Sequence, residues 1–180
     1  MTITLHAALP LAYETLRTCH SIAAAEGWFV PEYTVSTAIK GRTAGSVRFR
    51  ARRGSVRGRV DASTLEGVIL RLNMTMLAKN GADAVRDTVC HEFAHIVALA
   101  NWGIKGHQAA WRNACITLGG NGLTYHSYDL VEHEVRKGRR KLKVVCGCRD
   151  HDVTTLVYNR IYGGVKYQCR QCKEYVRIPG

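Results

Sequence analysis

Three side chains in one short run have the types and spacing that suit metal chemistry. The sequence His91-Glu92-Phe93-Ala94-His95 puts two imidazoles at positions i and i+4, one turn apart on the same face of a helix. At that separation both nitrogens can reach one zinc ion at about 2.0–2.1 Å. Glu92 lies beside the first ligand, close enough to take a proton from water in an open coordination position. The run therefore predicts a catalytic zinc site with Glu92 as its acid/base group.

A catalytic zinc site needs a third protein ligand, and His107 is the best candidate for it. The turn through Gly103 and Gly106 can fold His107 back toward the first two histidines. A histidine at the start of the next helix also needs less rearrangement than its rivals. Those rival third ligands are His126, Glu132 and His133. The alternative to a metal site is a helix whose two histidines face solvent or form hydrogen bonds in the core.

Periodicity predicts the elements that must position these groups. Apolar residues recur at helical spacing over residues 83–100, which contain the motif, and further helices are expected at 9–26 and 107–118. Strands are expected at 33–39, 46–50 and 67–72, with a turn at 163–164 between short strands near the C-terminus.

Two close cysteine pairs near the C-terminus predict a second metal site. Cys146-Gly147-Cys148 and Cys169-Arg170-Gln171-Cys172 suit a tetrahedral zinc held by four thiolates, and four ligands leave no open position. This zinc should therefore be structural. His151 could replace one thiolate, and free cysteines or a redox pair are the alternatives. The remaining cysteines, Cys19, Cys90 and Cys115, are interpreted as small core residues.

The charge balance favours contact with a polyanion. Lys and Arg number 26 against 14 Asp and Glu, which gives a net charge of +12. Residues 40–59 contain eight basic residues and no acid, and residues 136–143 form a second basic cluster. The residues expected to contact nucleic acid are Arg48, Arg50, Arg52, Arg53, Arg57, Arg139 and Arg140. The alternative for both clusters is a solvated loop.

Taken together, these motifs resemble the SprT-like family of zinc metalloproteases, which includes the Spartan-type proteases that digest proteins crosslinked to DNA. The resemblance is carried by His91-Glu92-x-x-His95, by Gly106-His107 with Trp111 four positions later, and by the cysteine pairs. The turn at Thr43-Ala44-Gly45 adds to it. It implies an α+β fold, with a compact, zincin-like metalloprotease domain over residues 1–140 and a zinc ribbon over residues 141–180. It also implies a zinc metalloendopeptidase with one catalytic and one structural zinc, acting on DNA-bound or DNA-crosslinked proteins.

Features that the sequence lacks lead to expectations about where the protein is located and how it is recruited. No basic run precedes an apolar stretch at the N-terminus, and no apolar run approaches membrane-spanning length. An odd number of crowded cysteines fits a reducing compartment, so a cytoplasmic, DNA-associated protein is expected. No tail for clamp- or ubiquitin-binding motifs is evident. Two other functions stay open: a nucleic-acid-binding zinc protein with an idle catalytic centre, serving transcription or repair, and a zinc hydrolase acting on a non-peptide bond.

Overall fold

The chain forms two units, residues Met1–Val131 and Glu132–Gly180. The structure is a computed structural model that describes residues 2–54, 59–129 and 141–179. The boundary expected after residue 140 falls in a stretch outside these residues. Each unit is described by itself.

A three-stranded sheet forms one layer of the first unit. Its order is β1 (Tyr33–Ser36), β3 (Glu66–Leu72), β2 (Gly45–Arg50), so β2 lies at an edge. The central strand β3 runs parallel to β1 and antiparallel to β2. Alternate residues of β3, Val68, Leu70 and Leu72, are buried, because one face of the sheet packs against helices. The strand expected at 33–39 ends at Ser36.

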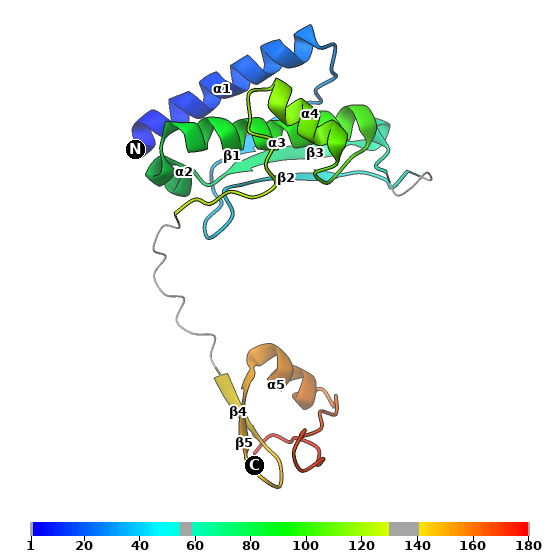
Figure 1. Cartoon of the computed structure of the whole chain (residues 1–180). Coiled ribbons are helices and arrows are strands. Elements are labelled where there is room, and N and C mark those ends of the chain that lie inside the picture. The colour runs from blue at the N-terminus through cyan, green and yellow to red at the C-terminus, as the bar shows by residue number, and fades with distance from the viewer. Residues whose placement is uncertain (1, 55–58, 130–140, 180) are drawn as a thin grey trace. The chain divides into compact units, whose positions relative to one another are not determined.

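The helix α3 (Ala82–Trp102) is the central element of this unit. It contacts β2, β3 and the helices α1 (Leu5–Ala25), α2 (Met74–Asn80) and α4 (Ala109–Thr117). It also contacts a short 3-10 turn, η1 (Ala62–Thr64). Figure 1 shows α3 between α1 and the sheet. The metal motif is therefore carried by the most enclosed helix of the unit, which holds its backbone rigid.

Capping residues account for the differences between expected and observed helix bounds. The helix α1 begins at Leu5 rather than near residue 9, because the Thr4 hydroxyl accepts a hydrogen bond from the Ala7 N–H at 3.2 Å. The short helix α2, which periodicity did not predict, is capped in the same way by Asn73. The helix α4 begins at Ala109, after an extended Gln108, so His107 precedes the helix instead of starting it.

The second unit pairs β4 (Lys141–Val145) with an antiparallel β5 (Asp150–Thr154), followed by α5 (Thr155–Tyr162). The hairpin turn expected at Gly163-Gly164 is wrong. The Thr154 hydroxyl caps a helix by accepting from the Val157 N–H at 3.4 Å, and that helix ends at the two glycines.

Both units combine helices with small sheets, so the α+β fold class is confirmed at that level. In the part of the chain that the structure describes, no helix is long and apolar enough to cross a membrane.

Candidate metal centre

Three imidazoles converge where α3 turns back toward α4. The Nε2 atom of His107 lies 3.1 Å from that of His91 and 3.2 Å from that of His95. The chain reverses after α3 because Gly103 adopts a left-handed φ of 65°, a conformation that L side chains rarely take. The predicted turn thus brings together the three predicted histidines.

The side chain of Trp111, from α4, forms the floor under all three rings. Its ring centroid lies 4.7 Å from that of His91, 5.2 Å from that of His95 and 4.3 Å from that of His107. The indole is buried, and its N–H donates to the His91 carbonyl oxygen at 3.4 Å. Trp111 therefore fixes ring positions by packing, a role that the sequence motif did not reveal.

The histidine geometry suits a tetrahedral metal ion. Ligand nitrogens about 2.0–2.1 Å from a tetrahedral zinc ion lie roughly 3.3 Å apart, close to the two Nε2 separations above. Burial lowers the pKa of His91 to about 4 and that of His95 to about 3, so both are neutral at pH 7 with lone pairs available. The donor set of three neutral imidazoles is the one that zinc takes when one position stays open for chemistry.

The carboxyl group of Glu92 is buried beside the triad under β2. Its side chain is only 6% exposed, and burial raises its pKa to about 8. A Cβ atom built on Gly45 would lie 2.6 Å from the Glu92 Cγ and 2.7 Å from its Oε1. Real Cβ atoms do not approach that closely, so a glycine at this position lets the edge strand close over Glu92.

Two cavities meet at this carboxyl group, and Gly45, His91 and Glu92 line both. One, of about 270 Å³, extends to residues 123–126 and Tyr128. The other, of about 330 Å³, runs along β2 past Phe49 to residues 104–105. The reactive centre thus has space on either side of it.

The loop after α4 is held against α3 by an interaction that the sequence did not suggest. The Asp87 carboxylate accepts from the backbone N–H of Asn121 at 2.8 Å and from its side-chain amide at 2.7 Å. The Leu123 carbonyl then accepts a hydrogen bond from the His91 imidazole. Asp87 lies one turn before His91, and that spacing is the only sequence signal for this second layer of support.

Of the three rival third ligands, the structure describes His126 alone. His126 lines the smaller cavity but does not belong to the group of three converging nitrogens. Glu132 and His133 lie outside the described residues.

Four of the seven predicted nucleic-acid contacts lie on and after β2. Arg48 and Arg50 are exposed and alternate with the half-buried Val47 and Phe49. Arg52 and Arg53 follow the strand and are also exposed. The remaining three predicted residues, Arg57, Arg139 and Arg140, lie outside the described residues.

The four predicted cysteines of the second unit also converge. Their sulfur atoms all lie within 4.8 Å of one another, with Cys148 at 3.4 Å from Cys146 and 3.8 Å from Cys169. Sulfur atoms about 2.3 Å from a tetrahedral zinc ion lie roughly 3.8 Å apart, so the group fits such an ion. A hydrogen bond from the Cys148 backbone N–H lowers the pKa of the Cys146 thiol to about 5. His151 stands beside this cluster, with its Nε2 3.1 Å from the Cys146 sulfur.

The other three cysteines are buried in the first unit. The sulfur atoms of Cys19 and Cys90 lie 3.8 Å apart between α1 and α3, and Cys115 is buried on α4. All three belong to the apolar core, as the sequence interpretation expected.

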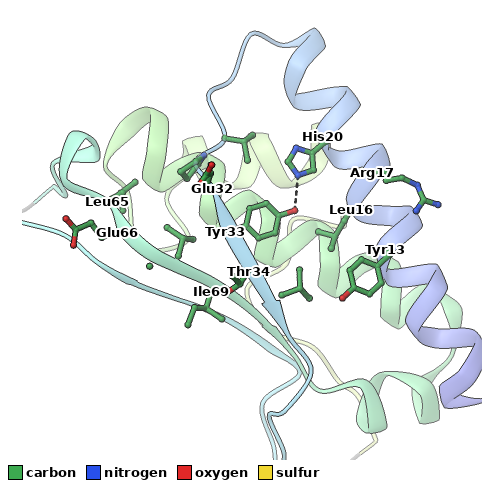
Figure 2. Close-up of a pocket in the computed structure, with 15 residues that line it drawn as sticks. Tyr13, Leu16, Arg17, His20, Glu32, Tyr33, Thr34, Leu65, Glu66 and Ile69 are labelled. Atoms are coloured by element: carbon green, nitrogen blue, oxygen red, sulfur yellow. Dashed lines mark hydrogen bonds between the residues drawn. The ribbon is translucent and has the colours of Figure 1, made fainter.

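A cavity of about 1070 Å³ lies apart from the triad, between α1 and the sheet. Figure 2 shows Tyr13 and Leu16 of the helix beside it, with His20 hydrogen-bonded to the Tyr33 hydroxyl at 2.9 Å. None of the three histidines of the triad and no cysteine lines it. A search for the functional site by cavity volume alone would therefore miss the residues that can bind a metal ion.

Comparison with known proteins supports one family. A model of the SprT-like family matches residues 22–129, which contain the three histidines, Glu92, Gly45 and the loop after α4. Protein SprT of Glaesserella parasuis serovar 5 (strain SH0165) is 27% identical over 144 residues, covering 78% of this chain and 80% of the relative. Protein SprT of Pseudomonas putida (strain F1) is 29% identical over 117 residues, or 62% and 69% of the two chains. Protein SprT of Escherichia coli O157:H7 is 29% identical over 113 residues, or 61% and 66%. No solved structure matches this chain. The family match spans more than half of the chain, which therefore belongs to the SprT-like family.

Proposed function

We propose that this protein is a zinc-dependent endopeptidase that cleaves proteins bound or crosslinked to DNA. The observation that carries the proposal is the convergence of three neutral imidazole nitrogens beside one buried carboxyl group. Family membership in SprT-like proteins supports a metallopeptidase.

His91, His95 and His107 would hold the ion, and Trp111 would keep their rings in place. A zinc ion bound there supplies Lewis-acid polarisation of the scissile carbonyl and lowers the pKa of water. Glu92 takes the proton from the attacking water and passes it to the leaving amine. Because its pKa is raised toward neutrality, Glu92 can carry a proton between the two steps; a cation at the triad would lower that value.

The position of β2 favours a polypeptide over a small substrate. This strand is at the sheet edge, and among the described residues it forms a ladder with β3 alone. Its outer edge offers backbone N–H and C=O groups to an extended peptide. The two cavities on either side of Glu92 let such a peptide continue in both directions, which suits cleavage within a chain.

The same strand offers a link to DNA. Arg48 and Arg50 project from the solvent face of β2, while Val47 and Phe49 face the cavity beside the triad. A polyanion held by these arginines would bring the proteins that it carries to the edge of the cleft. Such a role would place the protein at DNA in the cytoplasm.

The four cysteines of the second unit would hold a structural zinc. Four thiolates leave no coordination position for a substrate, and the described residues of their unit bury almost no apolar side chains. This zinc would act on folding rather than on catalysis.

A direct test incubates zinc-loaded protein with a basic DNA-binding protein, with and without DNA at low salt, and measures fragments. DNA should accelerate cleavage, Glu92→Gln should abolish it, and Arg48→Glu with Arg50→Glu should remove only the acceleration. Arg86→Glu, the same type of substitution at one exposed arginine of α3 and half of the charge change, is the control. Cleavage equal with and without DNA would remove the DNA part. DNA binding with no cleavage under any condition would favour the nucleic-acid-binding protein with an idle centre.

A further inference from the structure

The cavity that faces residues 123–128 contains a histidine outside the triad. His126 lines this cavity together with His91 and Glu92. It is near enough to His91 for its charge to lower the pKa of that ligand. It is therefore placed beside groups that would activate the attacking water, yet the steps assigned above do not use it.

A single tautomer of His126 is selected by the backbone. The Tyr128 N–H donates to the Nδ1 atom of His126 at 3.4 Å, so Nδ1 is an acceptor and carries no proton. In the neutral ring the proton then sits on Nε2. Among the residues that the structure describes, no group accepts a hydrogen bond from this Nε2–H. The ring is left with one free donor at the wall of the cavity.

The ring is also held in orientation. It stacks on the Tyr128 ring, with centroids 4.4 Å apart and planes 17° from parallel. The Tyr128 hydroxyl accepts from the Thr88 hydroxyl at 3.2 Å, and the Ala84 carbonyl lies 3.3 Å from it. Tyr128 is thereby tied to α3, the helix that carries His91. A donor fixed in advance is what a developing negative charge requires, because little reorganisation is then needed.

The neighbouring candidates are less suited. The Tyr128 hydroxyl is engaged with α3, and the Tyr125 side chain is 88% exposed, with no described contact that would orient it. Arg42 lines the same cavity but is exposed on the opposite loop, and it serves as the comparison in the test.

We propose that His126 is a catalytic residue whose Nε2–H donates a hydrogen bond to the oxyanion of the tetrahedral intermediate. The inference rests on the proposed peptidase function. When water attacks, the carbonyl π pair moves to oxygen. His126 stabilises that charge without transferring its proton, and the pair returns when the C–N bond breaks.

The test uses the zinc-loaded full chain, fluorescein-labelled casein and four proteins: wild type, His126→Ala, His126→Gln and Arg42→Ala. Removing one such donor lowers kcat by about 10²- to 10³-fold, and we expect that loss for His126→Ala with KM changed less than about threefold. His126→Gln keeps an N–H donor and should recover part of kcat. Zinc content should equal that of wild type in all four proteins.

A binding measurement separates this role from general support of the site. A phosphinic peptide, which mimics the tetrahedral intermediate, should bind His126→Ala with an affinity reduced by the same factor as kcat/KM. The uncleaved peptide of the same sequence should bind Glu92→Gln and the double variant Glu92→Gln/His126→Ala equally.

Three results would overturn the inference: a kcat for His126→Ala within about threefold of wild type, a raised KM at unchanged kcat, or a large kcat loss for Arg42→Ala alone. Failure of the proposed peptidase is distinguishable, because wild type and Glu92→Gln would then be equally inactive.

Discussion

Replacing Gly45 with alanine tests whether the approach of β2 to Glu92 sets the reactivity of that carboxyl group. The new Cβ would lie 2.6 Å from Cγ, 2.7 Å from Oε1 and 2.9 Å from Cδ of Glu92. Ordinary contacts begin near 3.4 Å, so the carboxyl group or the strand must move by nearly 1 Å. Glu92 is the more mobile partner, because the strand is fixed to β3 by its ladder.

A displacement of about 1 Å in a catalytic group costs roughly 10²-fold in rate, equivalent to about 2.7 kcal/mol of barrier. We therefore expect Gly45→Ala to lower kcat by about 10²-fold. The folded state should lose about 1–3 kcal/mol, as overpacked sites do. The histidines are untouched, so zinc content should be unchanged.

The assay measures peptide hydrolysis, zinc content and urea unfolding on the same preparations. Gly163→Ala is the matched control, because Gly163 lies in the other unit at negative φ, where a Cβ would meet the carbonyl oxygens of Asn159 at 3.3 Å and of Arg160 at 3.6 Å. If Gly45→Ala kept full zinc and at least half of the wild-type kcat, the argument that the edge strand positions Glu92 would be wrong.

Three further predictions concern the two metal sites and the exposed arginines of β2. Elemental analysis of protein purified without chelator should find two zinc ions per chain, and Cys169→Ser should lose one of them while the first unit stays folded. In chelator-treated protein the folded-state pKa of Glu92 is raised to about 8 from 4.5, so the folded state holds the extra proton and stability falls as pH rises between those values. Glu92→Gln has no carboxyl group to titrate at this position, so its free energy of unfolding should not show this fall with pH. In urea unfolding, the difference between Glu92→Gln and wild type should grow by at most about 1.4 kcal/mol per pH unit between pH 5 and pH 8. A difference that stays constant with pH would show that the pKa of the Glu92 carboxyl group is not raised by burial. DNA affinity, measured by fluorescence anisotropy, should fall steeply between about 50 and 200 mM salt, and Arg48→Glu with Arg50→Glu should reduce that slope.

Local spacing is why the sequence could predict the centre of the site. The i, i+4 separation of His91 and His95 and the glycine turn before His107 are properties of short segments. The rest of the site depends on contacts between residues far apart in the sequence, such as Gly45 and Glu92, which are separated by 47 positions. The contact between Gly45 and Glu92 exists because β2 lies under α3, and nothing in either segment encodes that packing.

Ambiguous local signals explain the remaining differences. A Gly-Gly pair can end a helix or make a hairpin turn, and only the Thr154 cap upstream decides for α5. The loop that carries His126 has no periodicity, and its place depends on Asp87 binding Asn121 across 34 residues.

The sparse interior of the second unit has a consequence for how the protein responds to its supply of metal. Among the residues described there, Val144 and Cys169 are the only buried ones, and α5 buries none of its side chains. The first unit has a continuous apolar core around α3 and keeps its histidines in place by packing on Trp111. Under zinc scarcity the cysteine unit should therefore unfold first and expose its thiols to oxidation and its backbone to proteolysis. Partial metal loss would leave the first unit folded and able to regain its own ion when zinc returns.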